Sequence, residues 1–184
     1  MMQGMCPLHE AEETGDALTA ACRSERFRPY LQTHRQLRAA LGRALVNGAQ
    51  SSPAELDALL TLYIAHQNAE ERYLHAPLRA RAPRATLAFD AEHEDQLDAI
   101  RVLRALLTER TTASSPAEAV TRELELRLAQ FIADGLAHMA EEEIAVTREL
   151  WRHFTDAQLR ELAQAMQTEV TQAVEACRHT IHFS

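Results

Sequence analysis

The sequence predicts an all-α protein, an up-down-up-down four-helix bundle with an additional C-terminal helix. The chain has 184 residues of which 46% are hydrophobic, enough for one well-buried domain and little for two. Gly (5), Pro (6) and aromatic residues are scarce, which is typical of helical proteins. Four long stretches with apolar residues at helical spacing are joined by short polar segments, as in such bundles.

Two helix starts are marked by the pentapeptide SSPAE, which occurs at 51–55 and at 114–118. In each copy the second Ser fits the N-cap, Pro fits the first helical position, and Glu completes a capping box three residues after the Ser. These signals predict one helix over about 53–76, ending before Pro77, and another over about 116–153.

Three further helices follow from caps and apolar periodicity. Ser24 can cap a segment that Asn47 and Gly48 end, and a second segment runs near 88–110. A fifth helix begins at Thr155 and either packs across the bundle or pairs with a second subunit in a homodimer; the sequence leaves both open. Its apolar stripe consists of Leu159, Leu162, Met166, Val170, Ala173 and Cys177.

These elements divide the chain into a leader (1–23), a bundle (24–154) and a C-terminal helix with its tail (155–184). No apolar run approaches about 20 residues, and the N-terminus lacks a basic start and an apolar signal core. We therefore expect a cytoplasmic protein with no membrane partner. A net charge of −8 without a concentrated basic face argues against nucleic acid as a partner.

The three cysteines, Cys6, Cys22 and Cys177, are odd in number and far apart. They suggest neither a disulfide framework nor a zinc site built on Cys, so reduced thiols are expected. The short motif CPLH, with Cys6 and His9, is only weak support for half a metal site.

The segment AHQNAEERYLHAP (65–77) contains two His/Glu pairs with four-residue spacing. At about 100° per residue, His66 and Glu70 lie in the middle of an apolar stripe. Glu71 and His75 fall on the opposite side. We therefore expect the first pair in the core and the second in solvent.

The same construction places one His on the inward face of each of the other three bundle helices. His138 faces the core together with Glu142 one turn later, in the motif HMAEE, whereas Glu143 lies about 140° away from His138. His34 and His93 lie at the centres of the apolar stripes of their own helices.

A lone His on an apolar face is more often a hydrogen-bonded core residue than a metal ligand. The combination is harder to explain, because burying four imidazoles and two carboxylates would leave several kcal/mol of uncompensated desolvation. The chain contains no Lys. Arg38 and Arg104 lie near the inward stripes and leave a core without metal open as an alternative.

This set of side chains suits two divalent transition ions, since imidazole binds Fe, Zn or Cu and carboxylates can bridge metals about 3.5 to 4 Å apart. Two His and two bridging Glu give each ion four protein ligands. An oxo or hydroxo bridge adds a fifth and leaves an open position for a small molecule such as O2, NO or peroxide. A structural zinc site would instead be closed and rich in Cys.

Over about residues 24–154 the sequence resembles the hemerythrin-like (HHE cation-binding) family. The resemblance rests on the order His34, His66-x-x-x-Glu70-Glu71 followed by Pro77, Glu92-His93, and His138-x-x-x-Glu142-Glu143. It implies a four-helix bundle that holds a non-haem di-iron centre. The implied terminal ligands are His34, His66, His93 and His138, and the implied bridges are Glu70 and Glu142.

Two positions differ from the oxygen carriers of that family. The carriers have a second His one turn after the third-helix ligand, where this chain has Leu97. Their second bridging acid lies five residues after its His, whereas Glu142 lies four after His138. The ligand set looks more like that of bacterial iron-centre repair proteins and related iron or oxygen sensors.

The resemblance therefore implies a protein that binds, senses or reduces O2, NO or peroxide, or handles iron. The alternative is a regulatory or interaction module that a metal stabilises, without catalytic turnover. Ferritin-like oxidases are disfavoured, because their Glu-x-x-His spacing is not the His-x-x-x-Glu found here. The sequence identifies no catalytic residue and leaves open whether the protein is an enzyme.

Overall fold

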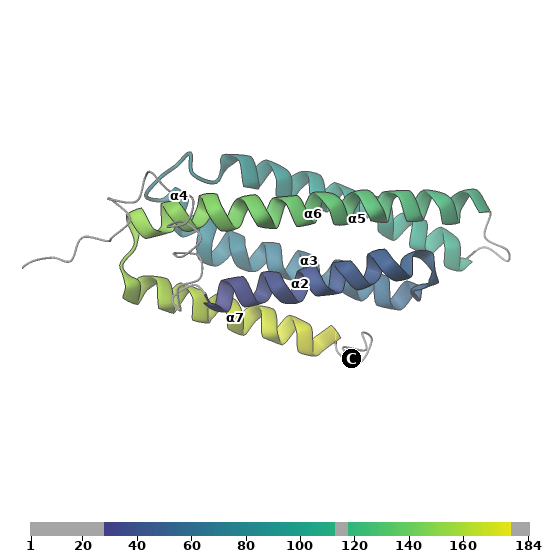
Figure 1. Ribbon diagram of the computed structural model, residues 1–184, viewed down its shortest axis with the longest axis horizontal. Coiled ribbons are helices and arrows are strands. Elements are labelled where there is room, and N and C mark those ends of the chain that lie inside the picture. Colours follow the sequence, from purple (N-terminus) through teal and green to yellow (C-terminus); the bar gives the residue numbers. More distant parts are fainter. Residues whose placement is uncertain (1–27, 113–117, 178–184) are drawn as a thin grey trace, which may run out of the picture.

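The computed structural model describes residues 28–112 and 118–177, and within these ranges it contains helices and turns but no strand. Five long helices lie side by side along the longest axis of the molecule (Figure 1). They are α2 (Arg28–Asn47), α3 (Pro53–Glu70), α5 (Leu87–Thr112), α6 (Glu118–His153) and α7 (Asp156–Cys177). The prediction of an all-α fold is confirmed. None of the described helices combines the length and the apolar character required to cross a bilayer.

The helix signals at both ends of the first loop act as predicted. The Ser52 hydroxyl accepts from the backbone N–H of Glu55 at 3.2 Å, and the Glu55 carboxylate accepts from the backbone N–H of Ser52 at 2.8 Å. α2 ends at Asn47, and Gly48 has a φ of +51° at the start of the 3-10 turn η3 (Gly48–Gln50). The predicted caps at Ser24 and Ser115 lie outside the described residues.

The predicted end of the second helix before Pro77 is wrong. α3 continues from Glu70 into a π-helical turn, η4 (Glu71–His75), and then into the short helix α4 (Ala76–Arg79), which contains Pro77. A proline in a helix lacks an N–H and its ring clashes with the carbonyl four residues earlier. The wider π turn, in which each N–H bonds to the carbonyl five residues back, lets the chain continue without a regular α-turn at this point.

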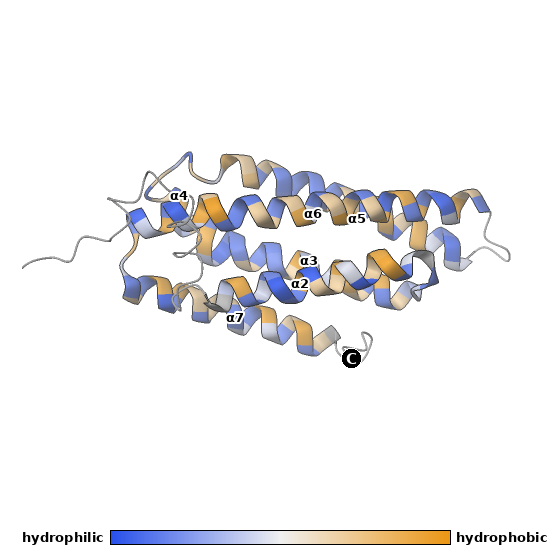
Figure 2. Cartoon of the chain, in the orientation of Figure 1, coloured by the Kyte–Doolittle hydropathy of each residue, from blue (hydrophilic) through white to orange (hydrophobic). Residues whose placement is uncertain are grey.

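The core is formed by the inward faces of α2, α3, α5 and α6, with α5 packed along α6. Hydrophobic and hydrophilic residues alternate along each helix, as expected when one face of a helix is buried (Figure 2). Fully buried side chains include Leu41, Leu60, Leu103, Phe131 and Leu150. Each contributes about 1.5 to 3 kcal/mol of transfer free energy when it leaves water. Leu45, near the end of α2, lies outside this core and is 51% exposed.

The apolar stripe of α7 packs within the same chain, against α2 and α3. Leu159, Met166 and Val170 are buried there. The hydroxyl of Thr33 on α2 donates to the side chain of Gln167 at 3.2 Å, which adds a polar link between the two helices. Of the two packings that the sequence left open, the structure shows the one across the bundle; pairing with a second subunit stays a prediction.

Gly135 on α6 lies directly against the side chain of Tyr63 on α3. A Cβ atom added there would lie 2.8 Å from the Tyr63 hydroxyl and 3.3 Å from its ring. Tyr63 cannot easily move away, since it is 1% exposed and its ring packs edge-on against Phe131 at 4.9 Å. Its hydroxyl also donates to Gln96 on α5 at 3.1 Å, so α3, α5 and α6 meet at this point.

We therefore predict that Gly135→Ala destabilises the protein. Overpacking costs about 1 to 3 kcal/mol, and the better helix propensity of Ala offsets up to about 1 kcal/mol of it. The free energy of unfolding, measured by urea denaturation, should fall by roughly 1 to 2 kcal/mol. Gly42→Ala on α2 is the matched control, because an added Cβ there has no neighbour within 4 Å. The control should be neutral or slightly stabilising; equal effects would refute the packing argument.

Candidate metal centre

The six predicted ligands lie in one buried cluster between four helices. None of them is more than 8% exposed. The cluster consists of His34 from α2, His66 and Glu70 from α3, His93 from α5, and His138 and Glu142 from α6. The predicted inward orientation of all six is confirmed, while their role as metal ligands stays a prediction.

One half of the cluster surrounds a single carboxylate oxygen of Glu70. Glu70 Oε1 lies 2.8 Å from His34 Nε2 and 3.0 Å from His66 Nε2. The two imidazoles come from neighbouring helices, and their rings meet edge to face at 4.8 Å. Two nitrogens and one oxygen therefore converge on one point in the core.

The other half contains His93 and His138, whose Nε2 atoms are 2.9 Å apart. Two nitrogens bound at about 2.1 Å to one ion, at right angles, would lie about 3 Å from each other. Glu70 Oε2 is 3.6 Å from His93 Nε2. Glu142 Oε2 is 3.8 Å from His138 Nε2 and 3.7 Å from His34 Nε2. Each carboxylate thus faces imidazoles of both halves, as a bridging ligand must.

The polar atoms of this cluster fit a bound cation better than an empty core. Among the described residues, Glu70 Oε2, Glu142 Oε2 and both ring nitrogens of His66 make no hydrogen bond, although all are buried. Buried unsatisfied groups each cost about 1 to 3 kcal/mol. Imidazole nitrogens and carboxylate oxygens together are donors that iron, zinc and related ions accept.

The arginines that could have balanced the buried charge do not reach it. Arg38 pairs with Glu143 at 2.7 Å, and Arg104 pairs with Asp57 at 2.7 Å on the exposed side of α3. No ion pair between an Arg and either Glu70 or Glu142 is present in the described parts of the chain. The alternative of a core neutralised by these arginines therefore loses its basis.

The prediction that His75 faces solvent is wrong. Its side chain is 0% exposed, and its Nε2 lies 2.6 Å from Glu142 Oε1. Its ring stacks on that of His93, with 5.2 Å between centroids and 7° between planes. Glu71, the other member of the predicted solvent-facing pair, is exposed as expected. His75 is thus a seventh ionisable member of the cluster.

The π turn explains this error. A constant 100° per residue puts His75, nine residues after His66, on the opposite side of the helix. In the π turn the chain takes one more residue to complete the turn, so the rotation lags by roughly 100° and His75 returns towards the inward face. Pro77, placed inside an otherwise helical pattern, was the signal in the sequence that the helix is irregular here.

Carboxylates from other helices hold the outer nitrogens of two imidazoles. His34 Nδ1 donates to Glu143 at 2.9 Å, and Arg38 donates to the same oxygen. His138 Nδ1 donates to Glu92 at 2.7 Å. Such contacts fix the ring orientation, and in a neutral imidazole they would hold the proton on Nδ1 and leave Nε2 to bind a metal ion.

Hydrogen bonds and charge shift the protonation of the cluster. Burial opposes protonation of His34, but its bonds to Glu143 and Glu70 raise its pKa to about 9. Burial likewise opposes protonation of His75, but Glu142 raises its pKa to about 9. Burial disfavours ionised Glu70, yet His66 and His34 hold its pKa well below the usual range. Burial lowers the pKa of His93. Without metal, His34 and His75 are therefore cations beside two carboxylates.

A third group of acids and His lies beside the cluster but already contains a cation. Glu71, His75 and Asp90 lie close enough to hold an ion. Arg79, however, donates to Asp90 at 2.9 Å and pairs with Glu71. Its guanidinium takes the place of a metal, so we assign this group to the support of His75.

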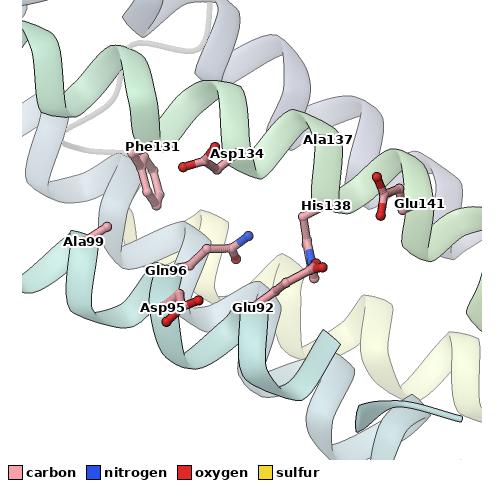
Figure 3. Close-up of a pocket in the computed structure, with 9 residues that line it drawn as sticks. All are labelled: Glu92, Asp95, Gln96, Ala99, Phe131, Asp134, Ala137, His138 and Glu141. Atoms are coloured by element: carbon pink, nitrogen blue, oxygen red, sulfur yellow. The ribbon is translucent and has the colours of Figure 1, made fainter. Parts of the chain in front are cut away.

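A pocket of about 290 Å³ reaches the outer edge of His138 from the surface. Figure 3 shows α5 and α6 lining it, with Glu92 turned towards His138. Its other acids are Asp95, Asp134 and Glu141. The negative charge around this opening favours the approach of cations and neutral molecules over anions.

The pKa shifts of His34 and His75 predict how metal-free protein responds to pH. Both values rise from 6.5 unfolded to about 9 folded, so their contribution to stability is full below pH 6.5 and is lost as pH rises through 9. After chelation, the Tm measured by calorimetry should fall between pH 7 and pH 9.5. A Tm that stays level or rises over this range would contradict the assigned protonation.

No family model, curated protein or solved structure matches this chain. The functional argument therefore rests on the side chains of the cluster and on their arrangement.

Proposed function

We propose that this chain is a hemerythrin-like di-iron protein that binds, senses or reduces a small neutral molecule such as O2, NO or peroxide. The observation that carries the proposal is the position of two buried carboxylates, Glu70 and Glu142, each facing imidazoles from both halves of the cluster. Two iron ions bound there would supply redox chemistry and a position for a small ligand.

In this proposal His34 and His66 would hold one ion, His93 and His138 would hold the other, and Glu70 and Glu142 would be available to both. The chain itself orients these donors and keeps bulk water away, since the cluster is buried. Glu143 and Glu92 keep the protons of His34 and His138 on Nδ1.

The proposal includes the up-down-up-down order of the four bundle helices. The colour gradients of consecutive helices in Figure 1 alternate in direction, which supports this order. In such a bundle, inward side chains of four helices can meet at one level, as the six cluster residues do.

The surroundings of the cluster favour a neutral ligand. The pocket beside His138 is lined by four carboxylates, which repel anions. Two buried phenols flank the cluster, and Tyr30 packs on His34 with 4.4 Å between ring centroids. Burial and nearby carboxylates raise the pKa of both Tyr30 and Tyr63, so both phenols stay protonated at neutral pH.

The alternative of an interaction module rested on the apolar stripe of α7. That stripe packs against α2 and α3, so its hydrophobic character is explained within the chain. No separate observation favours docking of a partner on α7, and we retain the di-iron proposal alone.

Protein purified under argon and loaded with Fe²⁺ should retain about two iron per chain after dialysis. Exposure to air should then produce ferric charge-transfer absorption. Elemental analysis and an optical spectrum measure both quantities. A preparation that retains no iron and binds only stoichiometric zinc would refute the proposal.

Two adjacent carboxylates on α6 provide a matched test of the site. Glu142→Gln removes a buried oxygen that faces both halves, so retained iron should fall from about two per chain to less than one. Glu141→Gln removes the same charge one residue earlier, from an exposed side chain, and should leave the iron content unchanged. Elemental analysis measures the iron content of both variants. Equal losses of iron would show that overall charge, and not the buried position of the carboxylate, governs metal content.

A further inference from the structure

We propose that His75 is a fifth imidazole ligand and that it makes the two metal positions unequal. In this assignment the position at His93 and His138 has three imidazoles, and the position at His34 and His66 has two. The inference rests on the di-iron centre proposed above. It adds a ligand that helical periodicity had placed on the solvent side, and it makes the two metal positions different.

The position of His75 in the core places it on one side of the cluster. Its side chain is fully buried, and Nε2 lies 2.6 Å from Glu142 Oε1. Its ring lies parallel to that of His93 at a centroid distance of 5.2 Å. His75 therefore belongs with His93 and with one oxygen of Glu142, while the other oxygen of Glu142 faces His34 and His138.

The outer nitrogen of His75 is held in the same way as those of His34 and His138. Nδ1 donates to Asp90 Oδ1 at 3.3 Å. Asp90 is fixed by Arg79 at 2.9 Å and by the Thr86 hydroxyl at 3.0 Å. A carboxylate on Nδ1 would hold the proton of a neutral imidazole there and leave Nε2 to bind a metal ion, which is the arrangement found around metal-binding His.

The backbone also supports a ligand role. His75 is the last residue of the π turn, and an α-helical continuation from His66 would have turned it to the opposite side. Isolated π turns are rare and frequently occur at functional sites. The irregular backbone here brings a polar imidazole into a core that an apolar side chain would fill more easily, which a structural role alone does not require.

The asymmetry has a consequence for ligand binding. With both carboxylates shared, the position at His93 has five protein donors and the position at His34 has four. An ion held by His34 and His66 would therefore have one protein donor fewer than an ion held by His93 and His138. Tyr30 packs against His34 on this side, with 4.4 Å between ring centroids.

Two variants at position 75 test the proposal. His75→Ala removes the ring, whereas His75→Gln retains a side chain that can donate to Glu142 but has no imidazole nitrogen. Both are loaded with Fe²⁺ under argon, and iron content and Mössbauer spectra are recorded. The wild type should show two quadrupole doublets of equal area, because the two ions have different ligands.

Both variants should bind one of the two ions at least about tenfold more weakly, since even outer-shell losses weaken metal binding by about 10- to 100-fold. The doublet of the ion at His93 should be lost or shifted, and the doublet of the other ion should remain. Added imidazole should restore the second iron and its doublet in His75→Ala. His153→Ala, which removes a part-exposed His at the end of α6, is the control and should change neither measurement.

Retention of two iron ions and of the wild-type spectrum in both variants would overturn the assignment of His75 and leave the di-iron proposal intact. Recovery of the wild-type spectrum in His75→Gln alone would also overturn it, because a hydrogen bond to Glu142 would then be sufficient. Absence of iron from the wild type would instead refute the proposed function itself, before any variant is compared.

Discussion

The burial of Glu70 and Glu142 is the constraint on which the rest of this structure depends. Two carboxylates at 0% exposure need positive charge nearby, and within residues 28–112 and 118–177 their ion-pair partners are imidazoles. These imidazoles come from α2, α3, α5, α6 and the turn η4, so all four bundle helices take part. A change in the position of any one of these helices would separate a carboxylate from its imidazole partners. A substitution that alters helix packing is therefore expected to alter the cluster as well.

Most of the fold and of the cluster follows from local sequence rules. The cap at Ser52, the stop at Gly48 and the inward direction of six ionisable side chains all follow from helix geometry within one segment. Contacts between helices could not be predicted in this way. Glu143 points away from the stripe of its own helix yet reaches His34 on α2, because the rotation and offset of two packed helices, not the period of either, decide that contact.

His75 shows a second limit of sequence periodicity. The 100° rule assumes one hydrogen-bonding pattern along the whole helix, and the pattern changes at η4. The change follows from competition between Pro77, which does not fit a regular α-turn, and the apolar residues on either side, which keep the helix in the core. Leu74 and Leu78 are both buried, so the chain preserves their packing and accommodates the extra residue within the turn.

The same groups connect metal binding to the stability of the bundle. In metal-free protein, the raised pKa values of His34 and His75 mean that protons on these rings balance Glu70 and Glu142. In the proposed metal-bound form an ion would have to displace those protons, because only the neutral imidazole can be a ligand, so binding would release protons and tighten as pH rises. Stability of the metal-free bundle changes in the opposite direction. Alkaline conditions would thus destabilise the metal-free bundle and favour the proposed metal-bound one. The buried carboxylates require cations in both forms.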